Sequence, residues 1–307
     1  MPNHNNIEKE QSSSLWNDAW VRLKKNKMAI FSLCILIFIF FCCFILPLLP
    51  FANVKNPNEG DLKSTFLPYS GDHLFGTDDQ GRDLFARVLY GGQISILVGL
   101  VATIVSVIIG VIYGAISGYQ GGRTDSIMMR IVDILYGLPF LVLVILFSLL
   151  VGSYMKEFGE FLIKDWGFSR EFVKRYISVI PLFIAIGSLG WLTMARMARA
   201  QVMSLKKQEF IEAARSLGLS HFRILFKHIL PNTLGPIIVY STLTIPGFIM
   251  FEATLSFLGL GVASPNASWG SLVNQGGNYM ETHLSLLTIP SSAFIITLLA
   301  LNFLGDG

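Results

Sequence analysis

The chain has 307 residues, of which 52% are hydrophobic and only 14% are charged, and its formal net charge is +3. Ordinary globular domains carry about 25% charged residues. The composition therefore excludes a soluble fold of this size and indicates a protein whose main solvent is membrane lipid. The small net charge and the lack of a long basic arm in the sequence argue against nucleic-acid binding.

Residues 1–27 are expected to be a cytoplasmic tail that ends in a helix lying in the membrane interface. Its apolar side chains share one helical face, its polar side carries Lys and Arg, and Ser14 is placed to cap it. The face consists of Leu15, Trp16, Ala19, Trp20 and Leu23. A short flexible tail is the alternative.

Six stretches without charged residues are each close to the ~20 residues that cross a bilayer as a helix. Because backbone in lipid must satisfy its own hydrogen bonds, the sequence predicts an all-α membrane protein with six transmembrane helices. The stretches are 28–51, 93–116, 134–155, 176–195, 229–251 and 284–304. The predicted organisation is a first transmembrane helix at 28–50, an extracytoplasmic loop at 51–91, and a transmembrane domain at 92–307.

The distribution of basic residues favours a cytoplasmic N-terminus. With that orientation, most of the 23 Lys and Arg residues fall on the cytoplasmic side. Arg22, Lys24, Lys25 and Lys27 immediately precede the first stretch and carry the most weight. The basic residues around Lys164 favour the opposite orientation, but acidic residues accompany them.

The predicted outer loop carries a helix-start pattern. Thr77 and Gln80 fit a capping box, which predicts a helix from Asp78 to about Gly91. Asp78, Asp79 and Asp83 could suggest Ca²⁺, but the loop lacks the ligand ladder and terminal glutamate of a calcium loop. A capped interfacial helix is therefore the preferred interpretation.

Small residues recur at spacings of three and four along the second stretch. Such a stripe lets helix backbones approach closely in lipid, so it predicts a packing surface, either within the chain or against a partner. The stripe consists of Gly99, Thr103, Ser106, Gly110, Gly114 and Gly118.

Catalytic and cofactor-binding patterns are missing from the sequence. It has no phosphate-binding G-x-x-x-x-G-K-[ST] loop, no H-E-x-x-H helix and no G-x-S-x-G elbow. The five histidines are scattered, and Cys34, Cys42 and Cys43 share one apolar run, where packing or lipid contact is expected. We therefore expect neither an enzyme nor a site for a metal or cofactor.

Residues 208–232 form the longest amphipathic, charge-rich segment, and they predict a helix–Gly–helix. Phe210, Ala213, Ala214 and Leu217 follow helical spacing and make a narrow apolar stripe. Gly218 is placed to end this first helix with a positive φ.

A second helix is expected over 221–230, with Ser220 as its cap and Pro231 as its end. Glu209, Glu212 and Arg215 offer charges at the edge of the first helix, so the segment is suited to docking. From the pattern alone, a solvated hairpin between two spans is the alternative.

The segment resembles the EAA signature of permease subunits of ABC importers. "EAARSLG" followed by "KHILPN" matches it at Glu212, Ala213, Ala214, Gly218, Leu230 and Pro231, whereas His228 stands where the broad consensus has Ile. "HLFGTDDQGRDLFARVLYGG", "SGYQGGRTDSIMMRIVDILYGLPF", "FEATLSFLGLG" and "SWGSLV" extend the resemblance to nearly the whole chain. They are similar to the C-type permease of the oligopeptide/dipeptide family, most closely its oligopeptide branch. Residues 153–176 are longer than that family's outer connection, so a surface insertion is expected, with a contact for the external binding protein as the alternative.

The resemblance implies a type I importer permease fold in the bacterial cytoplasmic membrane. It also implies a homologous B-type permease, two ATPase subunits and an extracytoplasmic peptide-binding protein as partners. The ATPase-coupling residues would be Glu209, Phe210, Glu212, Ala213, Ala214, Arg215, Leu217, Gly218 and Pro231. Within the family, dipeptides, nickel or another small solute are alternative substrates.

Asp133 and Glu252 are the ionisable residues nearest to membrane depth. Such residues suggest a transport pathway, but both lie within a turn or two of a predicted span end, so structural roles are favoured. A stand-alone channel or secondary transporter would require a midplane ionisable site or paired broken helices. Neither is evident in the sequence.

Overall fold

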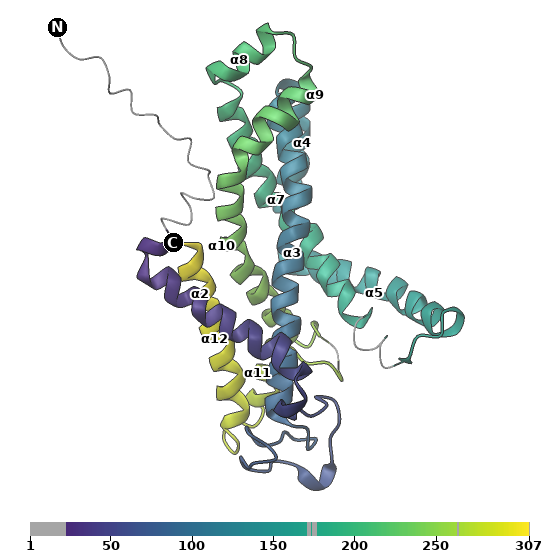
Figure 1. Cartoon of the computed structure of the whole chain (residues 1–307). Helices are drawn as coiled ribbons and strands as arrows, with labels where there is room; N and C mark the ends of the chain where they lie inside the picture. The colour runs from purple at the N-terminus through teal and green to yellow at the C-terminus, as the bar shows by residue number, and fades with distance from the viewer. Residues whose placement is uncertain (1–22, 171–172, 174–176, 263, 307) are drawn as a thin grey trace, which may run out of the picture.

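The computed structural model describes residues 23–170, 173, 177–262 and 264–306. Within these ranges the regular elements are helices, accompanied by two isolated β-bridges, Gly60–Arg82 and Thr77–Asp83. The helices form an elongated bundle with α8 at one end and the long loop before α3 at the other (Figure 1). We call these the α8 end and the loop end.

In the part of the chain that the structure describes, six helical stretches are long and apolar enough to cross a membrane, as the sequence predicts. They are Lys27–Leu48 (α2, η1 and η2), Leu84–Gln120 (α3), Phe140–Asp165 (α5), Ile180–Leu205 (α7), His221–Phe257 (α9, η6 and α10) and Ser285–Gly305 (α12). The other α-helices are α4 (Gly122–Tyr136), α8 (Glu209–Ser216) and α11 (Trp269–Gly277). Short 3₁₀ turns occur at Pro50–Ala52, Leu62–Ser64 and Ile177–Val179.

The central helix α3 packs most extensively against α7, and its small residues explain the fit. A Cβ added to Gly114 would lie 2.2 Å from the carbonyl oxygen of Ala195, and one added to Gly118 would lie 2.8 Å from that of Arg199. The stripe is therefore a packing surface within the chain, where close backbone approach strengthens van der Waals contact.

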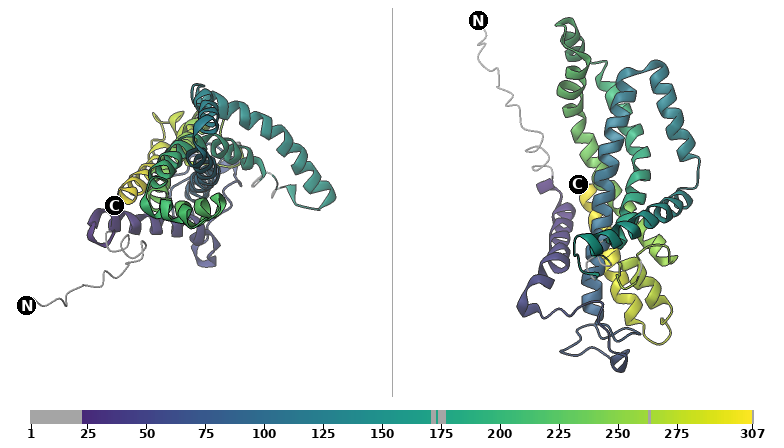
Figure 2. Two further views of the ribbon diagram at one scale, coloured as in Figure 1. Left: turned by 90° about the horizontal axis from the view of Figure 1, so that it is seen from above. Right: turned by 90° about the vertical axis from the view of Figure 1, so that its right-hand side faces the viewer.

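At the loop end, α11 inserts between α3, α10 and α12. Trp269 is 1% exposed, and its indole Nε1 donates to the Val88 carbonyl at 3.0 Å. A Cβ on Gly92 would lie 2.6 Å from the Trp269 ring. Figures 1 and 2 show α2 and α12 side by side along this half of the bundle, while α5 projects away from its flank.

The predicted helix from Asp78 to Gly91 is wrong at both ends. Residues 78–82 form a turn, and α3 begins at Leu84, where the Asp83 side chain accepts from the Ala86 N–H at 2.8 Å. Thr77 does not cap a helix, because its hydroxyl donates to the Ser64 carbonyl at 2.5 Å. The helix continues past Gly91 because this glycine packs against Ser268 rather than ending a helix.

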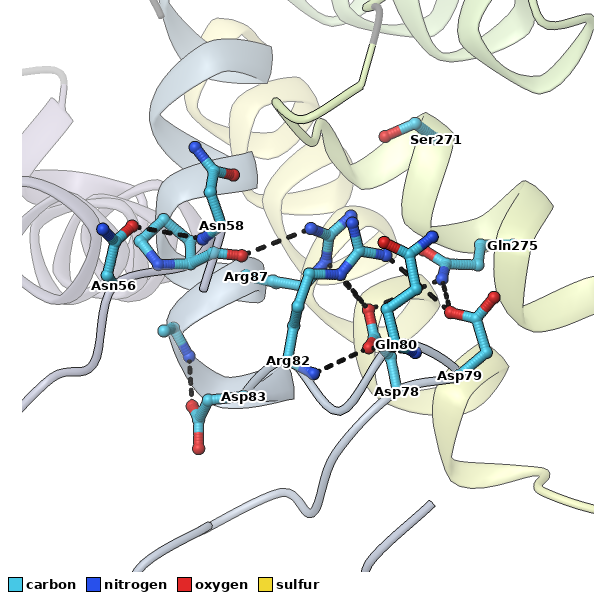
Figure 3. A network of polar contacts seen from close by, with 12 residues as sticks. Asn56, Asn58, Asp78, Asp79, Gln80, Arg82, Asp83, Arg87, Ser271 and Gln275 are labelled. Atoms are coloured by element: carbon cyan, nitrogen blue, oxygen red, sulfur yellow. Dashed lines mark hydrogen bonds and ion pairs between the residues drawn. The ribbon is translucent and has the colours of Figure 1, made fainter. Parts of the chain in front are cut away.

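The aspartates of this turn bind the chain's own donors (Figure 3). Asp78 is 2% exposed and accepts from the Arg82 backbone N–H at 2.9 Å and from its Nε at 2.7 Å. Asp79 accepts hydrogen bonds from Gln275 and Tyr279 of the α11 region, and its negative charge raises the pKa of Tyr279. The network ties the outer loop to α11, which agrees with the structural interpretation of these carboxylates.

Two further sequence predictions concern the N-terminal segment and the connection at residues 153–176. The N-terminal interfacial helix falls on residues 1–22 and Leu23, almost entirely outside the described residues. Most of the described part of residues 153–176 is not a loop, because α5 continues to Asp165. A Cβ on Gly159 would lie 2.8 Å from Val173, so the returning chain packs back on this helix.

Candidate functional site

The predicted first helix of the 208–232 segment is α8, at one tip of the bundle (Figure 1). It ends one residue earlier than expected, at Ser216, and Gly218 has the predicted positive φ of 75°. The Gly218 N–H donates to the Arg215 carbonyl at 2.9 Å, and the Leu219 N–H donates to the Ala214 carbonyl at 3.2 Å. These bonds satisfy carbonyls at the helix end, as a left-handed glycine allows.

The two faces of α8 differ from the sequence expectation. The buried side chains are Ile211 (0% exposed) and Ala214 (5%), whereas Phe210 is 40% and Leu217 is 81% exposed. Only Ala214 of the predicted apolar stripe therefore faces inward. We call Phe210, Ala213 and Leu217 the outer face of α8; all three are exposed, as are Glu209, Glu212 and Arg215.

The inner face of α8 is anchored to the span ends. Ile211 and Ala214 belong to one buried cluster with Ala115 and Tyr119 of α3 and Val202 of α7. Polar contacts add to it: the Tyr119 hydroxyl lies 2.9 Å from His221 Nδ1, and Lys206 Nζ donates to the Tyr119 carbonyl. The cluster also contains Ile224, Leu225 and Ile229 of η6 (Ile224–Ile229), so a force on α8 would pass into this segment as well as into α3 and α7.

Pro231 does not end the second helix, contrary to the prediction. The helix starts at His221, where the Ser220 hydroxyl accepts from the Arg223 N–H as expected, but it continues without a break to Phe257. Residues Ile224–Ile229 (η6) adopt a π-helix, and the Leu230 N–H donates to the Leu225 carbonyl, five residues back. This wider turn places Pro231 in the first turn of α10 (Leu230–Phe257), where a missing N–H costs little.

A partly buried ion pair reinforces the same end of the bundle. Asp125 of α4 is 8% exposed and accepts from the Ser117 hydroxyl and from two nitrogens of Arg199 of α7. The Arg199 guanidinium holds the pKa of Asp125 below its usual value, and the Ser117 hydrogen bond acts in the same direction. The contact locks α4 to α7, and the sequence analysis did not identify it.

A cavity of about 460 Å³ lies between α4, α5, α7 and α10. Its walls are mainly apolar and aromatic, with threonine and tyrosine hydroxyls interspersed. Its lining includes Tyr136, Phe140, Thr193, Tyr240 and Phe251.

The two ionisable residues near membrane depth, Asp133 and Glu252, have different surroundings in the structure. Asp133 accepts from Arg196 at 2.7 Å, and the same guanidinium stacks 4.3 Å from the ring centre of Tyr136, which lines the cavity. Both charged side chains are partly exposed, with 65% for Asp133 and 40% for Arg196. Asp133 therefore lies beside the cavity, with its charge paired.

Glu252, in contrast, is fully buried and holds helices together. It accepts from the Ser95 hydroxyl at 2.8 Å and from the Ser256 hydroxyl at 2.7 Å, and the Trp269 N–H donates to Ser95 at 3.2 Å. One side chain thus connects α10 with α3 and the start of α11.

Comparison with known proteins identifies the family. The family model described as "Binding-protein-dependent transport system inner membrane component" matches residues 106–307. The chain belongs to this family. A second model, "N-terminal TM domain of oligopeptide transport permease C", matches residues 14–68 of the permease.

Three relatives resemble the permease over 97% of its length. It is 43% identical to the dipeptide transport system permease protein DppC of Bacillus subtilis, covering 85% of that protein. It is 42% identical to the oligopeptide transport system permease protein OppC of Haemophilus influenzae and 41% identical to that of Escherichia coli K12, covering 88% and 90% of them. These relatives are transport permeases rather than enzymes, and the six apolar helices make this chain a multi-pass inner-membrane protein.

Proposed function

We propose that this permease is a subunit of an ATP-driven peptide importer and forms half of the translocation pathway. The observation that carries the proposal is the combination of family membership with a solvent-exposed, firmly anchored α8 that bears the EAA-like sequence. All three relatives described above are named as peptide permeases. The partners would be a homologous B-type permease, two ATPase subunits and an extracytoplasmic peptide-binding protein.

The α8 helix is proposed to dock on an ATPase. Phe210, Ala213 and Leu217 give it an exposed apolar face, and Ala213 lets a partner approach closely. Glu209 and Glu212 would pair with charges at the rim of the partner's groove, where such pairs fix orientation more than they add affinity. Arg215, the third charge of this helix, lines a separate cavity with Lys206 and His221. Gly218 would hold the helix end in shape, and Pro231 would lie within the continuous His221–Phe257 helix that leads away from the contact.

Nucleotide-driven movement would reach the pathway through the anchored face. Because Ile211 and Ala214 are buried in one cluster with residues of α3, α7 and η6, a displacement of α8 would move these elements with it. The permease pair would then exchange between inward-open and outward-open arrangements, with ATP biasing the equilibrium. This mechanism requires the α8 end to face the cytoplasm.

The proposed orientation has the N-terminus in the cytoplasm. The six spans of the described residues leave the start of α2 and the end of α12 on one side of the membrane, and the excess of basic residues favours the cytoplasmic side. In both α2 and α12, the end of the helix that is nearer to the α8 end of the bundle is the one next to the chain terminus, namely the start of α2 and the end of α12 (Figures 1 and 2).

The 460 Å³ cavity is proposed as part of the peptide pathway. A pathway for varied side chains needs an accommodating surface rather than a few sharp ligands, and these apolar walls with scattered hydroxyls supply one. Asp133 beside it would contribute a paired charge, whereas Glu252 would act only as a structural link. The binding protein would contribute most of the selectivity.

Uptake of labelled peptides by a strain that depends on this permease would test the proposal. Gly218→Ala should reduce uptake while membrane insertion stays normal. The φ of +75° at this position strains an alanine, although its added Cβ would meet no neighbouring side chain or backbone within 4 Å. Gly235→Ala is the matched control, since Gly235 also has open space but an ordinary φ. Normal uptake by Gly218→Ala would count against the coupling role, and transport of nickel but not of di- to pentapeptides would refute the peptide assignment.

A further inference from the structure

A second cavity, of about 780 Å³, opens at the α8 end between α3, α8 and the start of the His221–Phe257 helix. We call it the basic groove. Its residues are Ile116, Tyr119, Gln120, Lys206, Arg215, His221, Phe222, Leu225 and Phe226. Basic, aromatic and apolar side chains line it, and no acidic residue is among the lining.

The basic groups of the groove keep their charge available. Lys206 Nζ donates to the Tyr119 carbonyl and lies 5.5 Å from the centre of the Tyr119 ring, so its direct contacts are with neutral groups, and the Asp125 carboxylate acts on it only from a distance. Among the residues that the structure describes, no carboxylate lies within 4.0 Å of the charged atoms of Lys206 or Arg215. Glu212 is one turn from Arg215 on α8 but does not line the groove. The groove therefore has the charge to attract an anion.

The groove lies where three membrane spans end. Gln120 is the last residue of one span, Lys206 directly follows another, and His221 is the first residue of a third. Ile116 is four residues deeper, which corresponds to about 6 Å along a helix. Leu225 and Phe226 lie at a similar depth, and the tilted rings of Phe226 and Phe222 pack together with their centres 4.3 Å apart. Charge at the headgroup level thus sits directly above an apolar floor.

We propose that the basic groove binds an anionic phospholipid. Its phosphodiester would lie against Lys206, Arg215 and His221, and its acyl chains would follow Ile116, Leu225 and Phe226 into the hydrocarbon. Basic pockets between membrane helices recognise anionic headgroups in this way. A soluble protein partner would leave the apolar floor below the membrane surface uncovered, so the lipid fits both parts of the groove. The inference does not depend on the transported substrate.

Native mass spectrometry of the full-length permease in mild detergent tests the proposal. Phosphatidylglycerol should be retained several-fold more than phosphatidylcholine with the same acyl chains, and inorganic phosphate in excess should not displace it. Removing one basic group should lower retention about 5-fold, since each base near an anionic surface contributes roughly 1 kcal/mol. We therefore expect the largest loss from the pair Lys206→Gln and Arg215→Gln.

Arg223→Gln is the matched control, because Arg223 is an exposed base on the same helical turn as His221 but does not line the groove. It should change retention by less than 2-fold. Equal retention of the two lipids by the unaltered chain, or an equal loss from Arg223→Gln, would overturn the proposal. Displacement by phosphate would assign the groove to a free anion, and loss of lipid on adding the purified ATPases would assign it to a protein interface; either result also overturns it. If the double variant fails to fold, the lipid retention of Arg215→Gln alone and the comparison of the two lipids on the unaltered chain still test the proposal.

Discussion

The anchoring of α8 gives a prediction whose magnitude follows from the structure. Ile211 is completely buried in the cluster that joins α8 to α3 and α7. Ile211→Ala removes three buried carbons, which at ~0.8 kcal/mol each gives about 2.4 kcal/mol before any cavity term. With an unfilled cavity the cost rises to roughly 3 kcal/mol, within the range for Ile→Ala changes. The exposed face of α8 is untouched by this substitution.

This loss should appear as faster local opening of α8. Since 1.4 kcal/mol corresponds to a factor of ten, we expect amide hydrogen exchange in the α8 segment to accelerate about 50- to 140-fold. The amides of Leu217, Gly218 and Leu219 are informative, because each donates a hydrogen bond at the end of the helix. Exchange measured by mass spectrometry on the peptide that spans α8 provides the test.

Phe210→Ala is the control for this experiment. Phe210 neighbours Ile211 in the sequence but is 40% exposed and lies outside the buried cluster. Its truncation should leave exchange in α8 nearly unchanged, while impairing peptide-dependent ATP hydrolysis by the assembled transporter. If Ile211→Ala exchanges no faster than the unaltered chain, or if Phe210→Ala loosens α8 equally, the helix is not held through its inner face as described here.

Three further predictions concern the stability of the bundle, measured as thermal unfolding in detergent. Gly114→Ala should destabilise the folded bundle by ~1–3 kcal/mol, because the added Cβ would lie 2.2 Å from the Ala195 carbonyl oxygen. Gly152→Ala is the control and should not destabilise the bundle, because a Cβ at Gly152 would meet no neighbouring atom within 4 Å. Glu252→Ala should cost about 1–3 kcal/mol by leaving the Ser95 and Ser256 hydroxyls without their buried acceptor, while the exposed Glu281→Ala should change little. Because the pKa of Asp125 is lowered in the folded protein, its stabilisation is complete above the ordinary value of 3.8 and is lost as the pH falls through the lower folded value. Asp125→Asn should therefore reduce the stability at neutral pH, and the stability of this variant should fall less on acidification than that of the unaltered chain. Identical dependence of stability on pH in the variant and the unaltered chain would contradict the Arg199 contact.

The transmembrane helices could be predicted from the sequence because lipid leaves the backbone few choices. An apolar stretch of sufficient length must form a helix there, so the number of spans follows from composition alone. The helix ends could not be predicted in the same way. Thus α3 begins at Leu84 and passes Gly91 and Gly92 because these glycines pack on Ser268 and Trp269, far away in the sequence.

The candidate site was predicted in outline but not in its orientation. The positive φ of Gly218 and the cap at Ser220 are local features, and both were found. The inner face of α8 was not found, because an eight-residue helix with apolar residues on several sides has no unique buried stripe. Ile211 is inside because the ends of α3 and α7 meet it there.

Two other features depend on long-range contacts. Asp125 and Arg199 are 74 residues apart, and no local pattern pairs them. Pro231 continues a helix because the π-helical turn before it widens the backbone, and the general rule that proline ends a helix does not anticipate that.

Site-directed crosslinking tests most directly whether the outer face of α8 contacts an ATPase. Leu217 in this face is 81% exposed, and Leu62 at the loop end is 79% exposed, so cysteines at the two positions would be equally accessible. In native membranes, Leu217→Cys with a short bifunctional reagent should yield a product containing a Walker-motif ATPase, and Leu62→Cys should not. A crosslink to the ATPase from Leu62→Cys but not from Leu217→Cys would contradict the proposed coupling surface and reverse the orientation of the permease in the membrane.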